Sequence, residues 1–235
     1  MGELNGNGQR FPIAERSPLV RASQFGVENA DVWASPPAGE AAYEGYCAAL
    51  VPAVSRHYET VVAAIFDRYY TTDAGSGWPP APPTGADLAR SIREDLNRYL
   101  LFARCGLPLA RTADDLRENG PTNLVLAVEG MHFVHSHAQI DELLQAGVRV
   151  FALQYNRPNA LTRGDCTQFG QPDTLGLTEL GRGVVAQLFA AGAVLDLAHS
   201  APTTRADILR FAEENGYGDQ TAYTHGAIFA QIIAT

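Results

Sequence analysis

The pattern of apolar and polar positions becomes regular beyond residue 111. Short apolar runs predict strands at 123–130, 148–156, 193–200 and 219–226, and amphipathic periods between them predict helices at 136–147, 177–192 and 202–216. Strands that alternate with helices indicate βαβ units around a parallel sheet. The runs are continuously apolar, which is typical of strands buried on both faces. The sequence therefore predicts an α/β fold, either an open doubly wound sheet or a TIM-type barrel.

The first half of the chain is less regular. Apolar residues near a 3.6-residue period predict a helix over 40–70, interrupted around Pro52. A second helix is expected at 86–106, and the Gly- and Pro-rich segment between the two predicts a long loop. We expect this loop to lie inside one domain, because the segment before it offers no strand partners of its own.

Composition and charge narrow the class of protein. The chain has 235 residues, of which 46% are hydrophobic and 18% charged, as in an ordinary soluble globular protein. We expect a loosely packed N-terminus at 1–16 and one domain at 17–235. The net charge of −9 argues against a nucleic-acid partner. No apolar run approaches the roughly 20 residues of a transmembrane helix. Three widely spaced cysteines predict no disulfide framework and favour a reducing, cytoplasmic location.

Three consecutive predicted strands end on a residue type that binds metal ions. Glu129 ends LVLAVE, His199 ends AVLDLAH and His225 ends TAYTH. In a barrel, the carboxyl ends of the strands converge on the face that carries active sites. Carboxylate oxygen and imidazole nitrogen are ligands that Zn²⁺ takes. The shared position predicts a metal site, whereas each residue alone is more often structural; Glu129, for instance, could pair with Arg149.

Two further segments carry polar residues beside these strands. The stretch HFVHSH places His132, His135 and His137 close together, like a metal tract. The last two fall where the next helix starts, so we interpret the stretch as a polar loop. Tyr155 and Asn156 follow a strand and are candidate substrate-binding residues, although Asn and Pro are also typical of an ordinary turn. No phosphate-binding loop, GxSxG elbow or HExxH motif occurs.

At these residues the chain resembles the membrane (renal) dipeptidase family, peptidase family M19, of the amidohydrolase-like superfamily. Four segments match family motifs in order, within about 112–235: AVEGMH, AGVRVFALQYNRPNALTRGD, GLTELGRGVVAQLFAAGAVLDLAH and YTHG. The resemblance implies a TIM-type (β/α) barrel, of which five or six of the eight strands are recognisable. It also implies two zinc ions, with Glu129 bridging both and with His199 and His225 as ligands of the second.

The resemblance further implies hydrolysis of the peptide bond of dipeptides by a hydroxide that bridges the zinc ions. Tyr155 stands where many members have a substrate-contacting histidine, and Asn156 follows it. The HxD motif of the family's first strand is absent from the sequence, and the later aspartate and arginine are not recognisable. We therefore expect a partial barrel, truncated at both ends relative to the family. We also expect one zinc site and weak or no hydrolysis.

Two other interpretations stay open at this point. The first is a non-catalytic α/β protein on the dipeptidase scaffold that binds a ligand or a partner. The second is a different amidohydrolase-type activity, such as that of a lactonase or deaminase, against which the AVEG and GLTELG motifs argue. A partial barrel leaves open sheet edges, which a second copy of the chain could cover as a homodimer.

Overall fold

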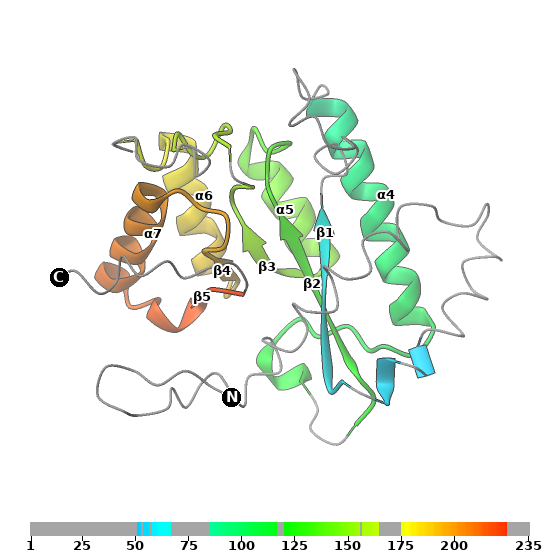
Figure 1. Cartoon of the computed structure of the whole chain (residues 1–235). Helices are drawn as coiled ribbons and strands as arrows, with labels where there is room; N and C mark the ends of the chain where they lie inside the picture. The colour runs from blue at the N-terminus through cyan, green and yellow to red at the C-terminus, as the bar shows by residue number, and fades with distance from the viewer. Residues whose placement is uncertain are drawn as a thin grey trace, which may run out of the picture.

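The computed structural model describes residues 51–52, 54–56, 58–66, 85–116, 120–155, 157–164 and 175–224. Within them, five strands form one parallel sheet in the order β1-β2-β3-β4-β5 (Figure 1). The strands are β1 Thr60–Phe66, β2 Asn123–Glu129, β3 Val148–Ala152, β4 Val194–Asp196 and β5 Thr221–Ala222. The helices are α4 Gly85–Arg104, α5 His137–Ala146, α6 Glu179–Ala190 and α7 Pro202–Asn215, with single 3-10 turns at η2 Ala113–Asp115 and η3 Gly218–Gln220.

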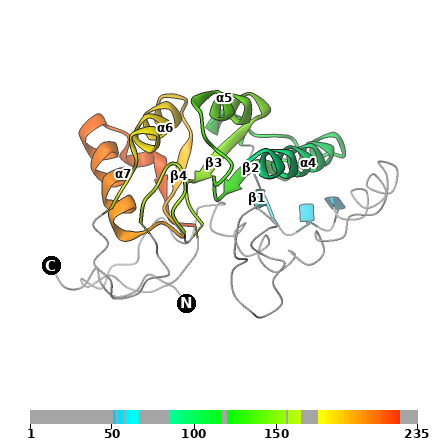
Figure 2. The same cartoon turned by 90° about the horizontal axis from the view of Figure 1, so that it is seen from above.

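The helices form a layer on one side of this sheet. Figure 2 shows α4, α5, α6 and α7 following its outer side. Sequential order, parallel pairing and a helix after each of the first four strands are the arrangement of a (β/α) barrel wall. The described strands do not close into a ring, since β1 pairs only with β2 and β5 only with β4. The expectation of an incomplete TIM-type barrel, with five or six of the eight strands, is confirmed by the five strands of the described residues.

Both faces of the central strands are buried. Leu124, Leu126 and Val128 of β2 belong to the large core beneath the helices. Val125 and Ala127, which alternate with them, belong to a smaller cluster on the opposite face. Successive residues of a strand point to opposite faces, so a strand covered on both sides needs apolar residues at every position. This arrangement explains the unbroken apolar run before Glu129.

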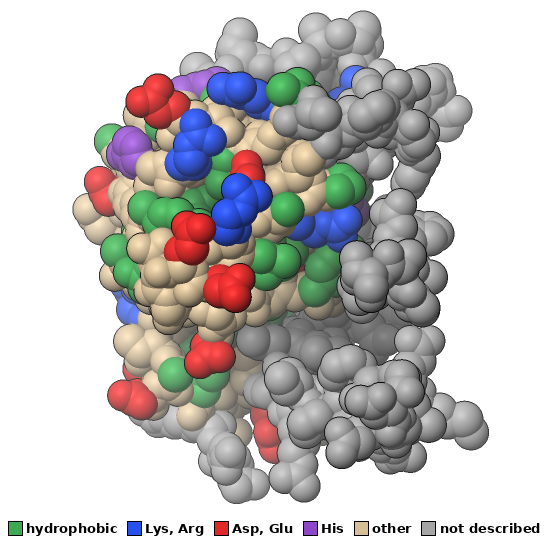
Figure 3. All heavy atoms as spheres, turned by 90° about the vertical axis from the view of Figure 1, so that its left-hand side faces the viewer, with side chains coloured by type: hydrophobic (Ala, Val, Ile, Leu, Met, Phe, Trp, Pro, Cys, Tyr) green, Lys and Arg blue, Asp and Glu red, His purple; other side chains and the backbone are tan. Residues whose placement is uncertain are grey.

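On the side of the molecule where α7 lies, acidic and basic side chains are interspersed with small apolar areas (Figure 3). Leu209 of α7 is 46% exposed there, while Ile208 beside it is fully buried. Alternation of this kind is typical of an amphipathic helix with one face in solvent. Within the described residues, no helix is both long and apolar enough to cross a membrane.

The helix predicted over 40–70 is wrong for its last part, because Thr60–Phe66 is strand β1. All seven of its residues pair in register with Asn123–Glu129 of β2. The segment TVVAAIF has apolar residues at spacings that a helix and a strand buried on both faces share, so periodicity cannot separate the two. Its β-branched residues favour a strand, and the pairing with β2 decides.

Capping residues mark both ends of α5. Ser136 forms a capping box with Gln139 at the start of α5, and Gly147 ends that helix with φ 104°. Helix α7 starts without a capping side chain. Ala201 is the N-cap residue and Pro202 follows it. The Ser200 N–H donates to the carbonyl of Leu197, which closes the turn after β4.

Candidate metal and substrate site

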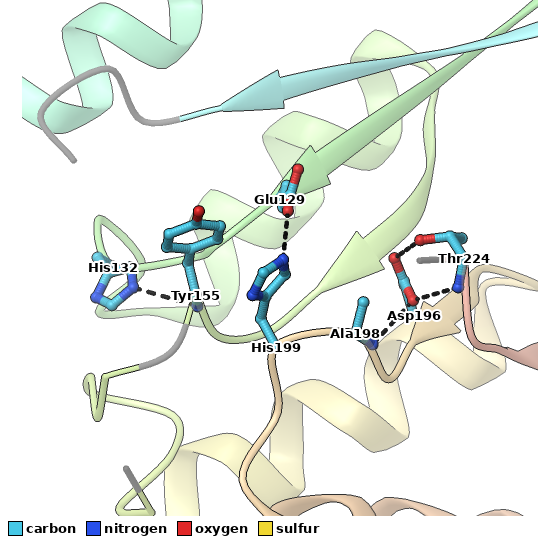
Figure 4. Close-up of polar contacts among 7 residues, drawn as sticks. All are labelled: Glu129, His132, Tyr155, Asp196, Ala198, His199 and Thr224. Carbon is cyan, nitrogen blue, oxygen red and sulfur yellow. Dashed lines mark hydrogen bonds and ion pairs between the residues drawn. The ribbon is translucent and has the colours of Figure 1, made fainter. Parts of the chain in front are cut away.

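The site residues lie where neighbouring strands end. Glu129 is the last residue of β2, Tyr155 follows β3 by three residues, and His199 follows β4 by three residues. The strands are parallel, so these ends share one edge of the sheet, which is the active-site face of barrel enzymes. Figure 4 shows the three side chains together at this edge.

Glu129 and His199 are in direct contact. The Nε2 atom of His199 lies 3.2 Å from Oε1 of Glu129, and the two side chains are 23% and 17% exposed. The contact is therefore largely sheltered yet reachable from solvent. A sheltered carboxylate needs a cationic or hydrogen-bonding partner, because burial of an unpaired charge is costly. The imidazole supplies such a partner, and a bound cation would do the same.

Arg149, the other partner considered for Glu129, lies near the amino end of its strand. Its guanidinium donates to the carbonyls of Arg111, Leu144 and Val148 at 2.6–2.9 Å. Burial lowers the pKa of this guanidinium from its ordinary value, and the nearby charge of Arg111 lowers it further. Arg149 therefore holds the loop and helix ends at the side of the sheet away from Glu129.

The separation of Glu129 and His199 suits two ligands of one ion. Ligand atoms bound to tetrahedral zinc at about 2.0–2.1 Å lie about 3.3 Å apart. The observed 3.2 Å between carboxylate oxygen and imidazole nitrogen is close to that value. Within the described part of the chain, no group of three or more His, Cys, Asp or Glu residues could hold a metal ion. His225, the third predicted ligand, lies outside the described residues.

The backbone at His199 adopts a left-handed conformation, with φ 57°. It sits in the turn that the Ser200 N–H closes on the carbonyl of Leu197 at 3.3 Å. A side chain at such a position costs about 1–2 kcal/mol relative to the right-handed conformation. Strain of this kind is found mainly where the surrounding structure requires a particular side-chain direction. Here the strained turn carries the imidazole to Glu129.

The strain at His199 can be measured with two variants that both remove the imidazole. We expect His199→Gly to be more stable than His199→Ala by about 1 kcal/mol, because glycine adopts positive φ without steric cost. Urea unfolding of both variants measures the difference. Greater stability of the alanine variant would show that the residue does not occupy the left-handed region.

Tyr155 packs against the imidazole of His199. Their ring centroids are 4.4 Å apart, and the ring planes are inclined by 34°. Gly130, with φ 83°, makes room for this arrangement, since a Cβ atom there would lie 3.0 Å from Cβ of Tyr155. The aromatic ring therefore forms a wall beside the Glu129–His199 pair. Asn156, the other predicted substrate-binding residue, lies outside the described residues.

His132 anchors the backbone of Tyr155. The Tyr155 N–H donates to Nε2 of His132 at 3.4 Å, as Figure 4 shows. Burial lowers the pKa of His132 to about 4, and a backbone hydrogen bond with Tyr155 that favours the protonated ring offsets this only in part. The imidazole is therefore neutral at neutral pH, which leaves Nε2 free to accept the hydrogen bond.

The lowered pKa of the half-buried His132 should make stability depend on pH. The folded-state pKa of about 4 lies below the ordinary 6.5, so the unfolded chain binds more protons between these values. The free energy of unfolding should therefore fall by up to about 3 kcal/mol as pH drops from 6.5 to 4. We expect His132→Gln to remove this dependence and His135→Gln, at an exposed position, to keep it. Equal pH profiles for wild type and His132→Gln in urea unfolding would contradict this account.

The other two histidines of HFVHSH behave as the sequence indicated. His135 and His137 are exposed at the start of α5. Nδ1 of His137 lies 2.7 Å from Oε1 of Gln187, which joins α5 to α6. Both residues therefore face solvent where the helix starts, as expected, although His137 is the first residue of α5 and not part of a loop.

Sequence reasoning missed two buried polar residues near the site. Asp196, at the end of β4, is 5% exposed and accepts hydrogen bonds from Ala198 and Thr224. Gln154, fully buried, donates to the carbonyl of Gly164 and accepts from the Ala201 N–H. The sequence did carry a signal for both residues, because each is a polar residue within or just after a predicted buried strand. A buried polar side chain must form hydrogen bonds, so such a position indicates a structural role.

A comparison with protein-family models matches residues 69–214, more than half of the chain, to the membrane dipeptidase family, peptidase family M19. The chain belongs to this family. The match covers Glu129, Tyr155 and His199, and it ends before His225. The resemblance that the four motifs suggested is thereby confirmed, and family M19 consists of metallopeptidases.

Solved structures of metallopeptidases and dipeptidases share the fold of the M19 chain. A dipeptidase described as a family M19 metallopeptidase is 23% identical with a TM-score of 0.56, and a metallopeptidase from Rhodobacter sphaeroides is 20% identical with 0.53. The probable dipeptidase PvdM from Pseudomonas aeruginosa is 19% identical with 0.53. The matches cover 68%, 82% and 68% of this chain and 49%, 59% and 42% of the solved chains, in that order. The chain thus spans about half the length of these proteins.

Proposed function

We propose that this M19 chain carries part of a dipeptidase site, in which Glu129, His199 and His225 hold one divalent ion, zinc. The observation that carries the proposal is the 3.2 Å contact between Glu129 and His199 at the carboxyl end of the parallel sheet. A carboxylate with two imidazoles gives the three protein ligands of an open catalytic zinc site. When bound there, the ion supplies polarisation of the scissile carbonyl and activation of a water molecule.

The residues around the pair have roles that follow from their contacts. Glu129 brings the negative charge that attracts a cation to a sheltered position. Tyr155 covers one side of the His199 ring, which limits the approach of water and leaves an aromatic surface for a small substrate. His132 holds the Tyr155 backbone in place as a neutral acceptor. Together they form a small site that solvent still reaches.

A dipeptide is the substrate class that the family membership favours. The related metallopeptidase from Rhodobacter sphaeroides was solved with a phosphinate mimic of the dipeptide L-Ala-D-Ala. We propose the same class of ligand for this chain. No HxD sequence occurs in the 235 residues, so recognisable ligands for a second ion are lacking. We therefore expect these 235 residues to hydrolyse dipeptides slowly, at or near the limit of detection.

The proposal is tested by binding and turnover together. A phosphinate mimic of L-Ala-D-Ala should raise the melting temperature only when zinc is present. The shift should vanish in His199→Ala and persist in His135→Ala, which changes an exposed histidine outside the proposed set of ligands. Absence of a zinc-dependent shift in the wild type would refute the proposed site. The wild type could instead hydrolyse dipeptides rapidly with zinc and lose this activity in His199→Ala. That result would refute the expectation of slow turnover.

A further inference from the structure

A buried carboxylate ties together the two strand ends that lead to the proposed histidine ligands. Asp196 is the last residue of β4 and is 5% exposed. Its Oδ1 accepts the N–H groups of Ala198 at 3.0 Å and of Thr224 at 3.1 Å. Its Oδ2 accepts the hydroxyl of Thr224 at 2.5 Å. Figure 4 shows these three contacts converging on the one carboxylate.

On the β4 side, Asp196 fixes the turn that carries His199. The bond to the Ala198 N–H folds the chain back directly after the strand, and Ser200 closes the same turn on Leu197. His199 lies between these two bonds in its left-handed conformation. A strained residue persists only when its surroundings over-determine it. The carboxylate of Asp196 is one of the groups that do so here.

On the β5 side, Asp196 adds hydrogen bonds to the very short pairing between β4 and β5. Thr221 and Ala222 are the only residues of β5, and a further bond joins the Leu197 N–H to the Ala222 carbonyl at 2.8 Å. Two residues of ladder fix the direction of a chain poorly. The two bonds from Thr224 to Asp196 extend the connection to the residue directly before His225.

We propose that Asp196 is a positioning residue, which sets the geometry of the metal site by holding the backbone at both His199 and Thr224. The part of this inference that concerns metal binding rests on the proposed function. The hydrogen bonds of Asp196 do not depend on that function. Asp196 does not reach the ion in this account, and its effect passes through the backbone. Groups that orient metal ligands typically change metal affinity by about 10–100-fold when removed.

The alternative is that Asp196 only stabilises the fold, as any satisfied buried carboxylate does. Thr122 provides a control for this alternative at the opposite end of the sheet. It is 1% exposed beside the first residue of β2, and its hydroxyl donates to the carbonyl of Tyr58 at 2.5 Å. Thr122→Val removes a buried hydrogen bond without touching the site, so general loss of stability appears in both variants.

The experiment measures zinc affinity of the whole chain by competition with a chromophoric chelator, under conditions where each variant is folded. We expect Asp196→Ala to bind zinc about 10–100-fold more weakly than the wild type. Asp196→Asn should stay near wild type, because its oxygen can accept both amides and its NH₂ can donate to the Thr224 hydroxyl. Thr122→Val should retain wild-type affinity. Unchanged affinity in Asp196→Ala, or equal losses in Asp196→Asn and Asp196→Ala, would overturn the proposal.

A second measurement on the metal-free protein separates this proposal from the proposed function. The NMR resonances of the His199 imidazole should shift or broaden in Asp196→Ala, and stay in place in Asp196→Asn and Thr122→Val. If the wild type binds no zinc, the proposed function is refuted. The His199 resonances then test by themselves whether Asp196 positions His199. Imidazole resonances that are identical in Asp196→Ala and wild type would overturn the positioning role.

Discussion

Replacing Glu129 by glutamine is expected to weaken zinc binding by on the order of 100-fold or more. The change keeps the size of the side chain and removes the charge that lies 3.2 Å from Nε2 of His199. Loss of groups that merely orient a metal ligand costs about 10–100-fold, so loss of a charged ligand should cost at least as much. Zinc titration in competition with a chelator measures the effect.

The matched control for this variant is Glu142→Gln. Glu142 is an exposed carboxylate on α5, 4.0 Å from Arg93. Its replacement lowers the negative charge of the chain by the same amount without changing the site. We expect zinc affinity within about twofold of wild type, because an exposed charge far from the ion is screened by solvent. Equal losses of zinc affinity in both variants would show that the overall charge of the chain attracts the ion. Glu129 would then not be a ligand.

Replacing Gly181 by alanine is expected to destabilise the fold by about 3 kcal/mol or more. Gly181 lies in the first turn of α6, where a Cβ atom would stand 2.0 Å from the carbonyl oxygen of Leu161. That carbonyl accepts the N–H of Thr178, the N-cap residue of α6, at 2.9 Å. The backbone must therefore shift and this bond must stretch or break, which belongs to the severe end of overpacking effects.

Gly183, two residues further along α6, supplies the comparison. A Cβ atom there would meet only the ring of His137, at 2.8 Å, and that ring belongs to an exposed side chain that can turn away at the cost of its contact with Gln187. Alanine also has the higher helix propensity, by up to about 1 kcal/mol. We expect Gly183→Ala to be neutral or stabilising in urea unfolding. Similar losses in both variants would indicate that α6 does not approach Leu161 as described.

Much of the fold follows from the sequence because local signals and tertiary contacts agree in the second half of the chain. Around α5, the capping box at Ser136 and the left-handed glycine at Gly147 mark both ends of the helix. Strand β1 is different, because the apolar pattern of TVVAAIF fits both a helix and a buried strand. Its β-branched residues favour a strand, and its seven-residue pairing with β2, from a distant part of the sequence, decides.

The sequence predicts only those residues of the candidate site that stand at the ends of predicted strands. Glu129 and His199 stand at the ends of apolar runs, and parallel strands bring such ends together. The role of Asp196 depends on Thr224, 28 residues away, and the neutral state of His132 depends on how the Tyr155 segment buries it. Contacts between loops of this kind have no periodicity along the chain, so a single sequence does not display them.

The central claim is that Glu129 and His199 share one metal ion at the carboxyl end of the sheet. The most direct measurement is anomalous diffraction at the zinc absorption edge, from crystals of the chain grown with zinc. The account predicts an anomalous peak within about 2.0–2.2 Å of both the Glu129 carboxylate and Nε2 of His199. A zinc peak at another position in the chain would contradict this claim. The absence of a zinc peak next to an intact Glu129–His199 contact would also contradict it.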